Sequence, residues 1–138
     1  MATSVKTYRL LAVLYALLVV TLSSWPSIRL PSLGTGHLDK LLHFGQYAFF
    51  AYLVSRAWGG AGPQDSVRLR RIRSNARRFA ILWVVLLLFA AVDEYHQGWI
   101  PGRDPDWRDW IADTLGIASG FWLGHWRHRA ASHARGVR

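Results

Sequence analysis

The sequence of 138 residues contains no cysteine. Without cysteine the chain can form no disulfide, no thiolate nucleophile and no cysteine-based metal site. Charged residues are also scarce, at 18% of the chain, whereas hydrophobic residues make up 51% and eight tryptophans are present. A soluble domain of this length rarely carries so much apolar surface, and a disordered chain never does. The composition therefore favours one folded domain, residues 1–138, that is in contact with an apolar solvent.

Polar positions are missing from long parts of the sequence. The stretches LLAVLYALLVVTL and ILWVVLLLFAAV lack the polar face that a helix of a soluble bundle would have. Helices that are apolar all round in so short a chain have no outer protein layer, so lipid must cover them. We therefore predict an all-α integral membrane protein with four transmembrane helices. The predicted spans are residues 8–25, 39–58, 78–98 and 109–126, with an Arg-rich loop over residues 59–77.

The first apolar stretch lacks the cleavage site of a signal peptide. Lys6 and Arg9 precede this stretch, as basic residues precede the apolar part of a signal peptide. However, Trp25 and Pro26 occupy the positions where small residues would be needed for cleavage. We therefore expect this segment to remain as the first span.

Basic residues are scarce on one side of the predicted membrane. Alternating spans place thirteen of the seventeen lysines and arginines on the side of the two termini. The other four are Arg29, Lys40, Arg103 and Arg108. Because basic residues accumulate on the cytoplasmic side, both termini and the loop 59–77 are predicted to be cytoplasmic. The arginines then serve orientation and attraction to anionic lipid, so we expect no nucleic-acid partner despite the net charge of +9.

The third apolar stretch ends in a group of ionisable residues. In FAILWVVLLLFAAVDEYHQGWIPGR, fourteen uncharged residues precede Asp93 and Glu94, and Gln97 and Arg103 follow. At about 1.5 Å per helical residue, Asp93 lies roughly 20 Å from the cytoplasmic end of the span. This is short of a hydrocarbon core about 30 Å thick. The two carboxylates are therefore predicted to lie within or at the outer leaflet.

The second and fourth spans begin with ionisable residues on that same side. Asp39 and His43 lie one helical turn apart in the second span, and Asp109 and Asp113 lie one turn apart in the fourth. Ionisable groups inside a membrane normally turn inward and pair with one another. Together with Lys40, these residues predict a polar pocket that opens to the outer surface.

Glycines recur every four residues in the fourth span, at Gly116, Gly120 and Gly124. A stripe of residues without side chains lets a neighbouring helix approach closely. We therefore assign the three glycines to helix packing. Asp113 lies one turn before Gly116, so close packing would press this carboxylate against the neighbouring helix.

The motifs DKLLH, DEYHQGWIPGR and DWIADTLGIASG, in this order, resemble those of the VanZ-like membrane protein family. The resemblance extends over residues 38–124, and the position of Asp113 is often asparagine in the family. It implies a multi-pass protein of the bacterial cytoplasmic membrane. The founding member of the family is associated with resistance to the glycopeptide teicoplanin, which implies a role in the cell envelope.

Three kinds of function remain open for the predicted pocket. In an enzyme, His43 would act as general base or acid, Asp39 would orient it, and Asp93 or Glu94 would be the complementary acid. A binding protein would instead hold an envelope lipid, a peptidoglycan precursor or a glycopeptide. In a purely structural protein, the charges would only lock the helices together. The residues expected to contact a substrate are Lys40, Gln97, Arg103, Asp109 and Asp113.

No cofactor and no metal are predicted. His43 together with Asp93, Glu94 and Asp109 offers nitrogen and oxygen donors of the kind that zinc or manganese accepts. Ligand identity alone, however, does not favour a metal. The expected partners are membrane lipids and a lipid-linked envelope precursor, and the small core of four short spans is compatible with a homodimer.

Overall fold

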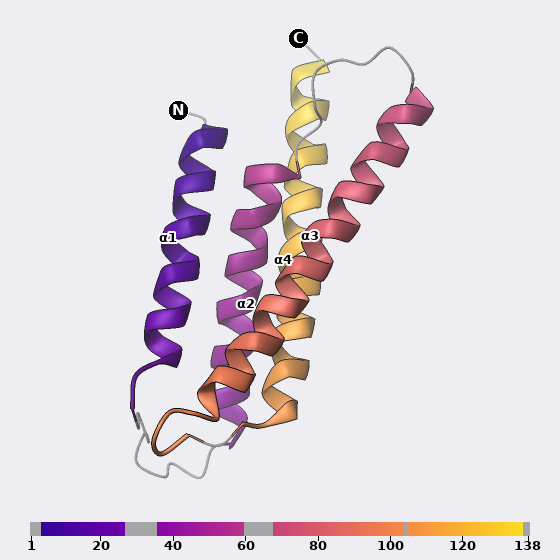
Figure 1. Ribbon diagram of the computed structural model, residues 1–138. Coiled ribbons are helices and arrows are strands. Elements are labelled where there is room, and N and C mark those ends of the chain that lie inside the picture. The colour runs from indigo at the N-terminus through magenta and orange to yellow at the C-terminus, as the bar shows by residue number, and fades with distance from the viewer. Residues whose placement is uncertain (1–3, 27–35, 60–67, 104, 137–138) are drawn as a thin grey trace.

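The computed structural model describes residues 4–26, 36–59, 68–103 and 105–136, which form four helices. The helices run alternately in opposite directions, so α1 and α3 end where α2 and α4 begin (Figure 1). The prediction of an all-α chain with four helices is therefore confirmed. The helices are α1 (Val5–Ser23), α2 (Gly36–Trp58), α3 (Arg68–Gln97) and α4 (Trp107–Gly136).

Two helices extend beyond the predicted spans. Helix α3 begins at Arg68, so ten residues of the predicted loop 59–77 are helical instead. Helix α4 continues to Gly136, ten residues past the predicted end of the fourth span. The spans were delimited by hydropathy, which marks where a chain leaves lipid. Arginine and alanine favour the helix in water as well, so the helices continue where the hydropathy falls.

Helix α1 differs from the others in its composition. Within the described residues, Val5–Ser23 is the one helix that is long and apolar enough to cross a membrane, and it lies near the N-terminus. The described parts of α2, α3 and α4 carry charged residues close to their ends, such as Lys40 and Arg56 in α2. These charges interrupt or shorten the apolar part of each helix.

Helices α2 and α4 form the largest helix–helix contact in the bundle. The glycine stripe of α4 faces α2 within the same chain. A Cβ atom on Gly116 would overlap the carbonyl oxygen of Phe44, and one on Gly120 would overlap the carbonyl oxygen of Ala48. Gly124 approaches a serine side chain of α2 in the same way. The stripe therefore lets two backbones of one chain come together, as small residues do in membrane helices.

Aromatic side chains fill the space between the remaining helices. Tyr15 of α1 meets Phe49 of α2 edge to face, with ring centroids 5.0 Å apart. Phe50 of α2 meets Phe89 of α3 in a similar arrangement at 5.4 Å. Offset and edge-to-face pairs of this kind add packing energy beyond the burial of their area. They hold α1 and α3 against α2.

Cations gather at the end of the bundle where the termini lie. The guanidinium of Arg56 stands over the ring of Tyr8, 5.1 Å from its centroid, and that of Arg9 stands over Trp58 at 5.9 Å. These contacts join the start of α1 to the end of α2. The described acidic residues lie in or beside the ends of α2, α3 and α4 that are opposite the termini, where α2 and α4 begin (Figure 1).

Candidate functional site

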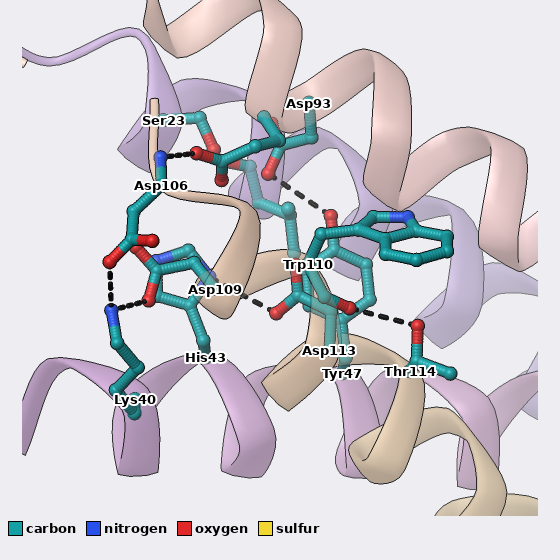
Figure 2. A network of polar contacts seen from close by, with 12 residues as sticks. Ser23, Lys40, His43, Tyr47, Asp93, Asp106, Asp109, Trp110, Asp113 and Thr114 are labelled. Carbon is teal, nitrogen blue, oxygen red and sulfur yellow. Dashed lines mark hydrogen bonds and ion pairs between the residues drawn. The ribbon is translucent and has the colours of Figure 1, made fainter. Parts of the chain in front are cut away.

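Polar and ionisable side chains from α2, α3 and α4 meet at the end of the bundle opposite the termini (Figure 2). We call this set the end cluster. Most of its members are buried, and the exceptions are Asp39, Lys40, His43 and Asp106. The members are Asp39, Lys40, His43, Tyr47, Asp93, Glu94, Gln97, Asp106, Asp109 and Asp113.

Lys40 joins the start of α2 to the start of α4. Its Nζ atom donates to Asp106 Oδ2 at 2.7 Å and to Asp109 Oδ1 at 2.5 Å. The Lys40 side chain is 27% exposed, whereas that of Asp109 is only 8% exposed. The hydrogen bond from Lys40 lowers the pKa of the Asp106 carboxyl below its usual value. One flexible ammonium therefore neutralises part of the charge of two carboxylates.

His43 contacts α4 one turn further along α2. Its Nδ1 atom lies 3.0 Å from Asp113 Oδ1, and Asp113 is almost completely buried. The sequence had suggested Asp39, on the same helix, as the residue that orients His43. In the structure, the bonded partner of the imidazole comes from α4 instead, because the glycine stripe brings that helix against α2.

Tyr47 continues the same face of α2 into the core. The ring is fully buried, and its hydroxyl donates to Asp93 Oδ2 at 3.0 Å. Asp93 is itself buried in the last turns of α3. A buried acceptor and a buried donor satisfy each other here, and leaving either unpaired would cost about 1–3 kcal/mol. This contact ties α2 to α3 beneath the more exposed part of the end cluster.

Asp106 organises the chain before α4. Its carboxyl oxygen accepts from the backbone N–H of Arg108 at 2.9 Å, so it caps the first turn of the helix. Its own backbone N–H donates to Glu94 Oε1 at 2.5 Å. The other carboxyl oxygen of Glu94, Oε2, is buried and has no hydrogen-bond partner among the described residues.

One predicted site residue, Arg103, lies apart from this network of contacts. Arg103 Nη2 donates to the carbonyl oxygen of Leu22, at the end of α1, at 3.5 Å. It follows a tight turn in which its backbone N–H bonds to Ile100 and Gly102 adopts a positive φ of 84°. Gln97 is buried at the end of α3. The geometry thus assigns Arg103 to the connection between α1 and the α3–α4 turn.

Two members of the end cluster, Tyr47 and Asp106, were missing from the predicted site set. Their contacts depend on packing between helices that are distant in the sequence. A signal was present for Asp106, because an aspartate directly before a helix is a typical N-cap. For Tyr47 the signal was its place one turn beyond His43 on the same helical face.

Negative charge exceeds positive charge in the end cluster. The described members include six carboxylates, those of Asp39, Asp93, Glu94, Asp106, Asp109 and Asp113, against Lys40 and His43. A carboxylate removed from water without a cation is costly. The arrangement is therefore suited to bind a group that carries positive charge, and it repels a free anion.

Three members of the end cluster could hold a metal ion. Asp39, His43 and Asp109 each offer one donor atom, and these atoms all lie within 4.8 Å of one another. Asp39 is exposed, which leaves the group open to solvent at the end of the bundle. The donor set differs from the one considered from the sequence, because it includes Asp39 and excludes Asp93 and Glu94.

The chain is therefore an antiparallel four-helix bundle with a hydrophobic core and a cluster of buried ionisable groups at one end. The family model described as VanZ/LLP1 matches residues 3–128. The chain belongs to this family, whose members are membrane proteins. Neither the curated proteins nor the solved structures compared with the chain gave a match.

Proposed function

We propose that the protein crosses the bacterial cytoplasmic membrane four times and presents the end cluster at the outer surface. Helices α2, α3 and α4 expose large apolar side chains, among them Leu41, Leu88, Val92 and Leu115, each more than half exposed. Exposed apolar patches of this extent are unusual on soluble monomers. A lipid environment would cover them, and the gathering of basic residues at one end of the bundle is the pattern expected of a cytoplasmic side.

Single cysteines test this topology cleanly because the chain has none of its own. Two exposed residues are suited to replacement by cysteine. Ala76 lies in the first third of α3, and Pro101 lies in the turn after its end. In intact cells, a membrane-impermeant maleimide is expected to label the cysteine at 101 and not the one at 76. After the cells are opened, both should react. Labelling of the cysteine at 76 alone in intact cells would place the end cluster on the cytoplasmic side.

At this surface, we propose that the end cluster binds the head group of an envelope lipid, a lipid-linked peptidoglycan precursor or a glycopeptide. The observation that supports this proposal is the excess of buried carboxylates over cations. A cluster that only locked helices together would be expected to pair its charges, because each unpaired buried charge destabilises the fold. Lipid head groups, precursor peptides and glycopeptides share amino groups, which would supply the missing positive charge.

Catalysis is a second candidate, and it is supported by the contact between His43 and Asp113. An imidazole whose Nδ1 atom is held by a buried carboxylate keeps Nε2 available to take or give a proton. Glu94, with one buried oxygen that lacks a partner, would be the complementary group. Both functions would use the end cluster, and they differ in whether the bound molecule is changed.

Binding and chemical change can be separated with the purified protein in nanodiscs. We expect Glu94→Gln to weaken the binding of an amine-bearing lipid-linked precursor by about tenfold or more, since about 1.4 kcal/mol corresponds to that factor. His96→Ala, two residues further along α3 and outside the end cluster, is the matched control and should bind normally. Native mass spectrometry reports the bound molecule and any change in its mass.

Three outcomes of that measurement have different meanings. An unchanged precursor that stays bound to the wild type supports a binding protein, and a changed mass supports an enzyme. No binding by the wild type to precursor, aminophospholipid or glycopeptide would leave the end cluster as a structural lock. In that case Glu94→Gln should change only the stability of the folded protein.

A further inference from the structure

We propose that Asp39, His43 and Asp109 form a binding site for a divalent transition metal, with zinc as the preferred ion. The three donor atoms come from two helices and lie within 4.8 Å of one another. Donors around a tetrahedral zinc stand about 2.0–2.2 Å from the ion. Asp39, the exposed member, is the one whose side chain has room to rotate towards an ion held by His43 and Asp109.

The orientation of His43 is that of a metal ligand. A histidine that binds a metal through one ring nitrogen usually donates a hydrogen bond from the other ring N–H to a carboxylate. This bond fixes the tautomer and makes the imidazole a stronger ligand. Here Asp113 Oδ1 holds Nδ1 at 3.0 Å and is buried. This leaves Nε2 as the nitrogen available to the ion. Asp113 is then a positioning residue and not a ligand.

Glu94 gives an independent indication that a positive group belongs at this place. The residue is only 9% exposed, and its Oε2 atom is buried without a hydrogen-bond partner among the described residues. Glu94 Oε1 accepts from the backbone N–H of Asp106, and the carboxylate of Asp106 shares the Lys40 ammonium with Asp109. A positive ion bound at Asp109 would therefore also reduce the excess negative charge that Glu94 contributes.

Lys40 is the present partner of Asp109 and would compete with a metal. Its Nζ atom contacts Asp109 Oδ1 and Asp106 Oδ2, but the side chain is partly exposed and flexible. An incoming ion can displace the ammonium from Asp109 while Lys40 keeps its contact with Asp106. Removing the ammonium should consequently tighten metal binding, an effect opposite to that of removing a ligand.

The donor types favour zinc over calcium and magnesium. Both of these harder ions prefer sites made of oxygen atoms, whereas zinc accepts an imidazole with carboxylates. Three protein ligands leave one position of a tetrahedral ion for water or for an oxygen of a bound head group. Only this last contact rests on the proposed function, since the metal site itself needs no lipid.

The test uses the full chain in detergent, with no added lipid, after removal of the affinity tag and of metals by a chelator. Zinc binding is measured by calorimetry, and bound metal is counted by mass spectrometry. We expect the wild type to bind one more zinc per chain than His43→Ala. Asp39→Asn should weaken binding by about tenfold or more, and Asp113→Asn by about 10- to 100-fold. Lys40→Met should tighten it, and His96→Ala should leave it unchanged.

Equal zinc binding by the wild type, His43→Ala and Asp39→Asn would overturn the proposal, because the signal would then come from other histidines such as His125. If His43→Ala does not fold, Asp39→Asn and Lys40→Met decide the outcome, since they affect exposed or partly exposed side chains and should shift the affinity in opposite directions. Failure of lipid binding in nanodiscs, with zinc binding intact in detergent, would reject the proposed function and keep the metal site.

Discussion

Replacing Gly120 with alanine is expected to lower the free energy of unfolding by about 1–3 kcal/mol, as overpacking does in a tight interface. The added methyl group would overlap the carbonyl oxygen of Ala48 and lie 2.9 Å from Ala51 Cβ. The first of these neighbours is backbone and cannot turn aside, so α2 and α4 would have to move apart. Unfolding of the detergent-solubilised protein by added SDS measures the loss.

Gly45→Ala is the matched control, because it makes the same change on α2. A Cβ at Gly45 meets no atom within 4 Å. Alanine there should be neutral or stabilise the helix by about 0.5–1 kcal/mol, the usual difference between the two residues in a helix. If Gly120→Ala lowers the free energy of unfolding and Gly45→Ala does not, the loss at Gly120 comes from the α2–α4 contact. Similar losses at both positions would contradict this packing.

The second large loss of stability is expected when Asp113 is replaced. Asp113→Leu removes the acceptor of His43 and should lower the free energy of unfolding by about 1–3 kcal/mol, the cost of a buried polar group left unpaired. Asp113→Asn retains an oxygen that can accept from Nδ1–H, so its loss should be smaller. The same SDS titration compares the two variants.

Thr114→Val provides the control for this pair. Thr114 follows Asp113 on α4, and its hydroxyl bonds to the carbonyl oxygen of Trp110 within the same helix. Its replacement should change the stability by less than about 0.5 kcal/mol, as is usual for surface positions. If asparagine proved as damaging as leucine at position 113, the negative charge itself would be required. An unchanged free energy of unfolding for Asp113→Leu would show that the contact with His43 contributes nothing to the stability of the fold.

The order of the helices and the glycine stripe could be read from the sequence, because both are local patterns. The apolar runs set where helices lie, and the recurrence of Gly116, Gly120 and Gly124 indicated a close helix contact. The spacing of Asp39 and His43 likewise placed them on one face. Helix α3 begins ten residues before the predicted third span, since hydropathy does not report where an Arg-rich helix begins.

The partners within the end cluster were not predictable from these patterns. The sequence placed His43 near several carboxylates, and the helix packing selected Asp113. It grouped Arg103 with the acids, whereas the turn after α3 directs this side chain to the end of α1. The role of Asp106 as a cap and as a partner of both Lys40 and Glu94 depends on three segments meeting at one point.

The sequence by itself determined the number of helices, their alternation and the separation of basic from acidic ends, because these follow from hydropathy and charge along the chain. Only the tertiary structure decided which acid meets which base, and that carboxylates outnumber cations among the described members of the end cluster. The reason is physical: helical spacing fixes the face on which a side chain lies, but the contact between α2 and α4 fixes the residue across from it. That contact exists because three glycines let two backbones approach.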